Sequence, residues 1–303
     1  MPPVLAIVGP TASGKSALAV EIAARTGAEI VGTDSMQVYL GMDIGTATPT
    51  LEERDGVPHH MIDVWEPAHG VTVAEFQAAA RNAIDDVHRR GYAAIVVGGS
   101  GLYVSAVLDD LTFPGTDPNL RARLEVDLER DGPEAMHARL AEIDPAAAEV
   151  ILPTNGRRIV RALEVVELTG EPFRATLPAP TAVVPAVRVG LEVPRDQMDA
   201  RIAARVDRMW ADGFVDEVRV LQAHGLAHTP TASRALGYQQ VLAFLDGEID
   251  EAEARQQTID ATRKFARRQQ RWFRRDPRIA WLAYDSPSLA EDALRLWASS
   301  TQT

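Results

Sequence analysis

Short apolar runs alternate with segments of helical periodicity in the first third of the chain. Val4–Val8 and Ala93–Val97 are apolar at every position, and Glu29–Gly32 is a shorter candidate strand. Between these runs, Ser16–Thr26 and Phe76–Arg90 place apolar residues at the spacing of an amphipathic helix. Fully apolar strands separated by helices are typical of a parallel sheet with helices on both faces. The pattern therefore predicts an α/β fold.

The pattern changes past residue 111. Residues 112–180 are rich in Ala, Arg and Glu, contain no convincing strand and are broken repeatedly by Pro and Gly. Residues 178–185 have the composition of a linker, and Val187–Val193 then predicts a strand that returns to the sheet. We therefore expect a helical segment inserted into the α/β fold.

These changes set the predicted domain organisation. Residues 1–111 and 185–303 form the core, and residues 112–184 form a smaller helical insertion domain. The last candidate strand is Ile279–Leu282. The residues after it are polar, and we expect them to lack regular structure.

Composition narrows the class of protein. The chain is 46% hydrophobic and 24% charged, as is ordinary for a soluble globular protein. No apolar run approaches the roughly 18 residues of a membrane span, and the first apolar run lacks the basic start of a signal peptide. The absence of cysteine excludes disulfides and thiolate ligands. We expect a cytoplasmic monomer that does not contact membranes.

The residues Gly9-Pro10-Thr11-Ala12-Ser13-Gly14-Lys15-Ser16 match the phosphate-loop motif G-x-x-x-x-G-K-[ST] in full. An apolar strand precedes the motif and a helix follows it, which is the context that the motif requires. Backbone N–H groups and the helix N-terminus would hold a diphosphate or triphosphate, with Lys15 on the outer phosphate. The hydroxyl of Ser16 is placed to ligate Mg²⁺.

The chain lacks the carboxylate with which many ATPases and kinases hold magnesium, at the end of an apolar strand. Here the strand Ala93–Val97 runs into Gly98-Gly99-Ser100-Gly101 instead. The acidic candidate is Asp34, just after the strand Glu29–Gly32, where strand ends converge on a ligand crevice. An Asp at this position is also common as a turn or helix-cap residue, and the local sequence leaves both readings open.

Taken together, the motifs of this chain resemble those of the tRNA dimethylallyltransferase family. The blocks that carry the resemblance are spread over the whole chain and are, in order, Gly9–Ser16, Asp34–Tyr39, Gly41–Ala47, Pro58–Asp63, Gly98–Tyr103, Arg157–Glu164, Ala235–Tyr238 and Thr262–Gln269. Beyond the phosphate loop no single block is decisive, but their order and spacing are highly specific. The resemblance implies a P-loop NTPase-like fold.

The resemblance also implies an activity, the transfer of a dimethylallyl group from its diphosphate to N6 of the adenosine 3′ to a tRNA anticodon. The diphosphate would bind at Gly9 and Thr11–Ser16, where Lys15 and Mg²⁺ on Ser16 stabilise the departing pyrophosphate. Asp34 would take the proton from the attacking amine. Ser35, Met36 and Gln37 would contact the RNA, with the Gln37 amide on the edge of adenine.

Two further catalytic roles are implied, and two sites receive none. Ser100 would contact the RNA, and Arg234 would lie near the transferred phosphates. Gln239 stands where the family is commonly basic, and we assign it no role. His59 and His60 are adjacent, and adjacent residues seldom converge on one metal ion, so we interpret them as structural.

The charge distribution supports RNA binding independently of the resemblance. The net charge is −12, yet residues 255–278 carry nine basic and two acidic residues. If this segment is a helix, seven of its basic residues fall within an arc of about 140° around the helix axis, and we expect no acidic partner there. They are Arg263, Lys264, Arg267, Arg268, Arg271, Arg274 and Arg275. A face of one sign favours a phosphate track over a solvated surface. Beside it, Phe265 and Trp272 could pack on the core or stack on a base.

A second basic cluster lies in the insertion domain, at Arg157, Arg158 and Arg161. Two basic faces, one in each domain, would allow an RNA stem to be bound between them. The target base would have to leave its stack to reach Asp34.

Three alternative functions share the phosphate loop. A small-molecule kinase would need no basic helix near the C-terminus. Prenyl transfer to free adenine nucleotides would leave both arginine clusters without a role. A nucleotide switch without catalysis would give no role to Asp34 or Ser100.

Overall fold

The computed structural model describes residues 3–174 and 181–300. Six parallel strands form one sheet in the order β3-β2-β4-β1-β5-β6. Their bounds are β1 Val4–Val8, β2 Glu29–Gly32, β3 His59–His60, β4 Ala94–Gly98, β5 Ala186–Glu192 and β6 Ile279–Ala283. This confirms the predicted α/β, P-loop NTPase-like class. The two-residue strand β3, which pairs with β2, was not predicted.

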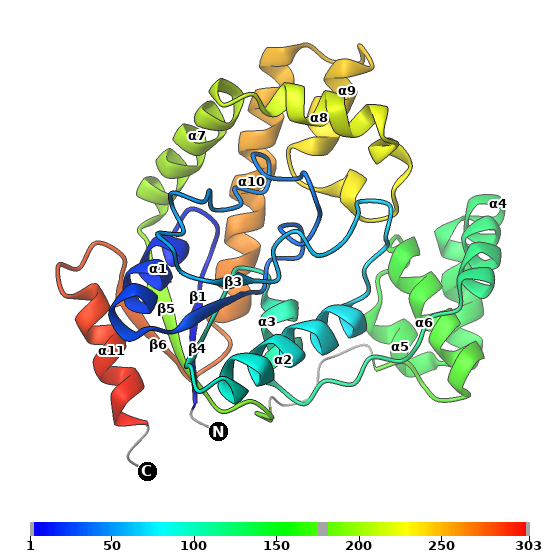
Figure 1. Cartoon of the computed structure of the whole chain (residues 1–303). Helices are drawn as coiled ribbons and strands as arrows, with labels where there is room; N and C mark the ends of the chain where they lie inside the picture. The colour runs from blue at the N-terminus through cyan, green and yellow to red at the C-terminus, as the bar shows by residue number, and fades with distance from the viewer. Residues whose placement is uncertain (1–2, 175–180, 301–303) are drawn as a thin grey trace. The chain divides into compact units, whose positions relative to one another are not determined.

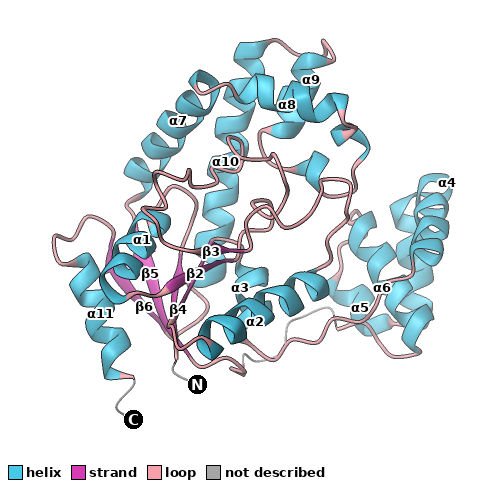
Figure 2. Cartoon of the chain, in the orientation of Figure 1, coloured by secondary structure: helices cyan, strands magenta, loops and turns pink. Residues whose placement is uncertain are grey.

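Helices cover both faces of the sheet (Figures 1 and 2). Helices α1 Lys15–Thr26 and α11 Leu289–Ser299 pack on one face, and α2 Val73–Arg89 and α3 Gly101–Leu108 pack on the other. The same unit also contains α7 Arg195–Ala211, α8 Phe214–Ala223, α9 Tyr238–Leu245 and α10 Glu251–Phe273, with short 3₁₀ helices η1 Leu226–His228 and η2 Ala232–Arg234. Alternate residues of each strand point to opposite faces. In β1, Leu5 and Ile7 join a core with α1 and α11, whereas Ala6 and Val8 join the core beneath α2 and α3.

The expectation that the tail lacks regular structure was wrong. Residues after β6 form α11, whose Ala290, Ala293 and Trp297 are buried against the sheet. The Trp297 indole N–H also donates to the Pro3 carbonyl at 2.8 Å. The tail contains many polar residues, but its apolar ones recur at helical spacing, and this stripe decides its structure.

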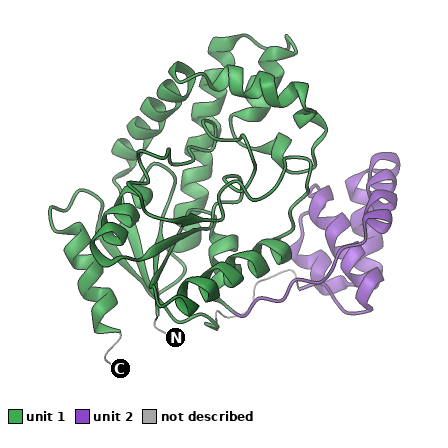
Figure 3. Cartoon of the chain, viewed as in Figure 1, with its two compact units in different colours: residues 1–109, 182–303 green, residues 110–181 purple. Residues whose placement is uncertain are grey.

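The chain divides into two compact units (Figure 3): residues 1–109 with 182–303, and residues 110–181. The predicted insertion, 112–184, differs from the second unit by two or three residues at each end. In the second unit, α4 Pro118–Ile143, α5 Pro145–Val150 and α6 Gly156–Thr169 pack around a core of their own. Residues 178–180 of the predicted linker lie outside the described residues.

The first unit holds both chain ends of the insertion at one point. Asp109 and Ala182 pair as an antiparallel bridge. The Asp109 carboxylate is buried and accepts hydrogen bonds from the guanidinium groups of Arg188, at 2.7 and 3.4 Å, and Arg278, at 2.8 and 3.1 Å. A buried carboxylate paired with two guanidinium groups fixes this connection, because losing one partner would leave a buried charge unpaired.

Candidate active site

The phosphate loop connects β1 to α1 at the carboxyl end of the sheet. Gly9, Ala12 and Gly14 have φ angles of +144°, +61° and +97°, which curl the backbone. Ser13 is buried, and its hydroxyl has no hydrogen-bond partner within the described part of the chain. A buried hydroxyl without a partner is costly unless a ligand supplies one. The loop therefore has the form and an open hydrogen-bonding group suited to a bound anion.

Lys15 lies buried at the start of α1, and its Nζ donates to the Pro10 carbonyl at 2.7 Å. Burial, followed by the charge of Arg205, lowers the pKa of Lys15 to about 7, and the charge of Asp34 opposes both. An arriving anion would favour the ammonium form. Lys15, Arg205 and Asp34 therefore belong to one electrostatic group.

Two arginines of α7 hold the phosphate loop, and the sequence did not single them out. Arg205 donates to Thr11 Oγ1 at 3.1 Å and to the Thr46 carbonyl at 3.3 Å, and Arg201 donates to the Ala12 carbonyl at 2.7 Å. Burial lowers the pKa of Arg205, and Asp34 acts in the opposite sense. A guanidinium so close to the loop can bind diphosphate oxygens with two N–H groups.

The glycines after β4 explain why no carboxylate stands at that strand end. A Cβ on Gly98 would lie 2.0 Å from Thr33 Oγ1, so a side chain there is excluded. At Gly99 the space is filled by the Gln269 amide, 2.5 Å from the position of a Cβ. Gln269, buried on α10, also accepts a hydrogen bond from the Thr11 backbone N–H at 2.9 Å. The magnesium-binding aspartate of many ATPases is thus replaced here by close backbone packing.

Gln269 was missed by sequence reasoning, although a signal existed. It interrupts the apolar stripe of α10 between Ala266 and Phe273, at helical spacing of three and four residues. A buried polar residue on an apolar face usually has a specific partner. One turn further, Trp272 packs against Gly101, where a Cβ would lie 2.1 Å from its ring. Of the two roles considered for Trp272, packing on the core and stacking on a base, the structure shows the first.

Asp34 follows β2 and is half-buried. Its Oδ1 accepts the Met36 backbone N–H at 2.9 Å, so the turn role considered from the sequence is present. Oδ2 has no hydrogen-bond partner among the residues that the structure describes, which leaves it open to a proton donor. Both readings of Asp34 are therefore compatible. Ser35 and Met36 beside it are also half-buried.

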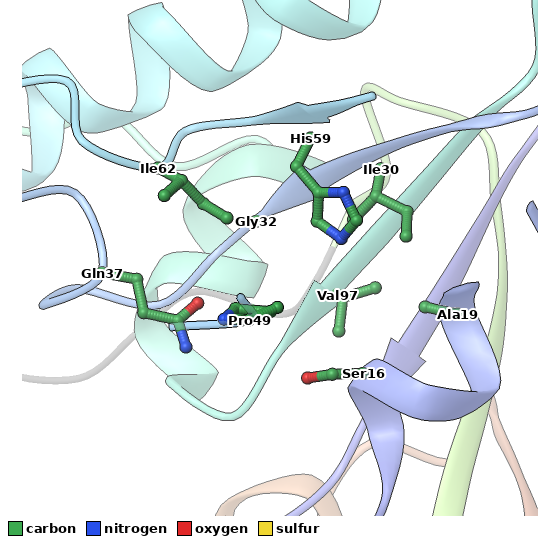
Figure 4. Close-up of a pocket in the computed structure, with 9 residues that line it drawn as sticks. All are labelled: Ser16, Ala19, Ile30, Gly32, Gln37, Pro49, His59, Ile62 and Val97. Carbon is green, nitrogen blue, oxygen red and sulfur yellow. The ribbon is translucent and has the colours of Figure 1, made fainter. Parts of the chain in front are cut away.

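Ser16 and Gln37 face a small cavity between α1, β2 and β4 (Figure 4). Its walls include Ile30, Val97 and Ile62. The Gln37 amide donates to the Ala47 carbonyl at 3.0 Å and, more weakly, to that of Thr46 at 3.3 Å. Its donor is therefore engaged with the loop at 46–47 in this structure, and its carbonyl oxygen is the atom left for a ligand.

Ser100 is the N-cap residue of α3, but its hydroxyl does not cap the helix. The side chain is thus left for another partner. Nearby, burial raises the pKa of Tyr103 to about 12, with smaller contributions from Tyr39 and Asp34. Tyr103 therefore stays a neutral phenol beside Asp34.

The remaining predicted positions lie elsewhere. Arg234 is exposed on η2, and the side chains that contact the phosphate loop are those of α7 and α10, so its role at the phosphates stays a prediction. His59 and His60 have separate partners: His59 Nδ1 lies 2.8 Å from the Val57 carbonyl, and His60 Nε2 lies 2.6 Å from Glu29 Oε2. No group of three or more His, Asp or Glu among the described residues could hold a metal ion. Mg²⁺ keeps several waters and takes ligands from bound phosphates, so it needs no such cluster, and the role predicted for Ser16 stays a prediction.

The basic face of α10 is less uniform than its sequence suggested. Asp199 Oδ1 from α7 lies 3.9 Å from both Arg263 and Arg267, and Glu192 pairs with Arg274. Arg263 also lies 3.5 Å from Asp260 on α10 itself. The expectation of a face without acidic partners was therefore wrong for these three residues, because α10 supplies one partner and other elements supply the rest. Within the described residues, the members of the face without an ion pair are Lys264, Arg268, Arg271 and Arg275.

The three arginines of the basic cluster on α6 also differ in their surroundings. Arg157 and Arg158 are exposed in the first turn of the helix. Arg161 donates to the carbonyls of Pro114 and Gly115 and to the buried carboxylate of Glu164 at 2.6, 3.0 and 2.7 Å. Its guanidinium thus stabilises its own unit, and its predicted contact with RNA stays a prediction.

No helix in the described ranges is long and apolar enough to cross a membrane. The comparisons with known proteins agree with one another. The family model for IPP transferase matches residues 37–276. The tRNA dimethylallyltransferase of Thermobifida fusca is 60% identical over 301 residues, which cover 98% of this chain and 94% of that protein. The one from Streptomyces coelicolor is 60% identical over 282 residues, covering 93% and 90%.

Solved structures extend the likeness to the fold. A full-length tRNA isopentenylpyrophosphate transferase from Bacillus halodurans superposes with a TM-score of 0.73 at 38% identity, covering 100% of this chain and 97% of that one. A eukaryotic dimethylallyltransferase acting on tRNA gives 0.77 at 25% identity, covering 98% and 78%. With a family model over most of its length and relatives at 60% identity, this chain belongs to the IPP transferase family of tRNA dimethylallyltransferases.

Proposed function

We propose that this protein transfers a dimethylallyl group from dimethylallyl diphosphate to N6 of the adenosine 3′-adjacent to the anticodon of tRNA. The observation that carries the proposal is the meeting of Lys15, Arg205 and Asp34 at the carboxyl end of the sheet. Two cations suit a diphosphate, and a carboxylate beside them suits a proton donor. The relatives named tRNA dimethylallyltransferase support the same assignment.

The residues divide the reaction between them. The diphosphate binds at Gly9 and Thr11–Ser16, with Lys15 and Arg205 on its oxygens. The adenosine N6 attacks C1 of the dimethylallyl group while the C1–O bond breaks, and both electrons of that bond leave with pyrophosphate. Asp34 accepts the N6 proton, and the cations stabilise the charge that develops on the leaving group.

Magnesium would be held by Ser16, with diphosphate oxygens and water as its other ligands. It would neutralise charge on the leaving group. Ser35–Gln37 and Ser100 contact the RNA near the target base, and Lys264, Arg268 and Arg271 bind phosphates. The protein acts in the cytoplasm as a monomer.

The test uses purified protein with Mg²⁺, dimethylallyl diphosphate and an anticodon stem-loop that carries the target adenosine. Mass spectrometry should show one added dimethylallyl group on that adenosine. A stem-loop with guanosine at the same position is the matched control and should gain no mass. Prenylation of AMP, ADP or ATP alone would favour the nucleotide alternative, and ATP-dependent phosphoryl transfer would favour a kinase.

A further inference from the structure

Two sequence blocks, Gly41–Ala47 and Ala235–Tyr238, have been given no catalytic or ligand-binding role so far. They are far apart in the chain, yet both contact one carboxylate, that of Glu217 on α8. Its oxygens accept the backbone N–H groups of Asp43, Ile44 and Gly45 at 3.0, 2.6 and 3.2 Å. Oε1 also accepts the Tyr238 hydroxyl at 2.6 Å. Three successive backbone N–H groups that converge on one anion form a nest, here filled by a side chain of the protein itself.

Packing fixes the same turn from the other side. A Cβ on Gly45 would lie 2.2 Å from the Phe214 ring and 2.4 Å from the Tyr238 ring, so only glycine fits there. Both rings are fully buried and meet edge to face, with centroids 5.0 Å apart. Burial, followed by the charge of Glu217, raises the pKa of Tyr238, which keeps its hydroxyl a donor. The turn is therefore held by three hydrogen bonds to Glu217, which Tyr238 fixes in turn, and by two rings.

The same turn also contacts two residues of the active site. Immediately after the nest, the Thr46 carbonyl accepts from Arg205 at 3.3 Å, and the Ala47 carbonyl accepts from Gln37 at 3.0 Å. Arg205 in turn contacts Thr11 of the phosphate loop. Arg205 and Gln37 are the groups that the proposed reaction assigns to the diphosphate and to adenine. A shift of the turn would move both acceptors together.

We propose that Glu217 is a positioning residue for the transfer reaction, which fixes the turn at 43–47 and through it the Arg205 guanidinium and the Gln37 amide. The inference rests on the proposed function for the identity of the ligands. Its structural core, the control of Arg205 by Glu217, does not depend on that identity.

The test compares Glu217→Gln with the wild type by calorimetric titration of inorganic pyrophosphate, well below the unfolding temperature. The neutral amide keeps the size of the side chain but loses the charge, and it turns an N–H₂ group toward backbone donors. We expect pyrophosphate to bind at least about fivefold more weakly, the scale of one ordinary hydrogen bond. The value of kcat/KM for dimethylallyl diphosphate should fall by a similar factor. Glu217→Asp, which keeps the charge on a shorter side chain, should lose less and serves if the Gln variant fails to fold.

The matched control is Glu29→Gln. Glu29 is also a buried carboxylate of the first unit, paired with Arg90 and His60, but it lies at the opposite end of β2 from the phosphate loop. We expect this variant to lower the melting temperature and to leave pyrophosphate binding unchanged. This control therefore shows whether a general loss of stability is enough to weaken pyrophosphate binding.

A double-mutant cycle with Arg205→Met tests whether Glu217 affects pyrophosphate binding through Arg205. If Glu217 acts through Arg205, then Glu217→Gln should weaken pyrophosphate binding by less than about twofold in the Arg205→Met background. An equal loss in both backgrounds, or unchanged pyrophosphate binding in Glu217→Gln, would overturn the proposal. Absence of prenyl transfer by the wild type would instead count against the proposed function, because the binding cycle does not require turnover.

Discussion

Asp34 carries two tasks with its two carboxylate oxygens. Oδ1 closes the turn onto Met36, and Oδ2 is the atom proposed to take a proton from the substrate amine. An amide at this position would keep the first task, since its carbonyl oxygen still accepts the Met36 N–H. It would lose the second, because an amide is not a useful base at neutral pH.

We therefore predict that Asp34→Asn binds the anticodon stem-loop with near wild-type affinity but turns over at least about a hundredfold more slowly. Filter binding and single-turnover kinetics measure the two quantities separately. Near-normal turnover would remove Asp34 from proton transfer, and lost RNA affinity would show that its role lies in binding.

Lys15 predicts a pH dependence of diphosphate binding. Its pKa is about 7 in the structure, and a bound anion should raise it. Between the free and bound pKa values the protein must take up a proton as it binds, so uptake is expected above about pH 7 and should vanish well below it. Pyrophosphate titrations in buffers of different ionisation enthalpy measure this uptake. Lys15→Arg, which stays charged throughout, is the control for protons exchanged by pyrophosphate itself, and equal uptake in both proteins would contradict the prediction.

The residues that sequence reasoning found and those that it missed differ in a physical way. The phosphate loop and Asp34 could be predicted because each is local: a motif flanked by a strand and a helix, and an acid at a strand end. Arg205 and Gln269 contact Thr11 across 194 and 258 residues of sequence. In an Arg-rich chain, nothing in the local sequence distinguishes Arg205 from the other arginines of α7. Gln269 was detectable only as a polar break in an apolar stripe.

At the scale of elements, α10 has two distinct sides. One side presents Gln269 and Trp272 to the glycine loop after β4 and to the phosphate loop. Another carries basic residues, of which some are already paired with acids and others are not. The unpaired ones have more to gain from RNA phosphates, because no internal salt bridge must be broken first.

We predict that Lys264→Gln combined with Arg271→Gln weakens stem-loop binding and lowers the slope of log K against log salt by about one for each lost phosphate contact. The control is Arg255→Gln on the same helix, whose guanidinium is paired with Asp207 and should contribute little. Fluorescence anisotropy over a range of salt concentrations gives both slopes. An unchanged slope in the double variant would make this side of α10 an ordinary solvated face.

The elements themselves were predicted unevenly. Five strands were found because each contains a short apolar run, continuous in β1 and interrupted by charged residues in β5. The strand β3 is only two residues long and contains two histidines, so no periodicity marks it. The helix α11 was not predicted, because the polar composition of the tail suggested irregular structure and its apolar residues at helical spacing were overlooked.

At the scale of the whole molecule, the insertion is connected to the core by a single fixed point. Asp109 and Ala182 are paired, so their Cα atoms lie about 5 Å apart, as in any antiparallel pair. Each of the two units is compact and has its own apolar core.

We predict that replacing residues 110–181 by a short Gly-Ser linker leaves a folded core that still binds pyrophosphate. If the insertion contacts RNA as proposed, this variant should bind the stem-loop much more weakly than the full chain. Circular dichroism melting, calorimetry and anisotropy test the three statements. A core that fails to fold would contradict the independence of the first unit, and undiminished RNA binding would remove the insertion from the RNA site.

The chain contains only two lysines, Lys15 and Lys264, among 31 basic residues. With its pKa lowered to about 7, Lys15 is deprotonated far more readily at neutral pH than an exposed lysine, and the uncharged form is the nucleophile. An acylating reagent small enough to reach the phosphate loop should therefore label the diphosphate site with little competition from other side chains. Protection of Lys15 by pyrophosphate, measured against the labelling of Lys264 as an internal reference, would report occupancy of the diphosphate site in one mass spectrum.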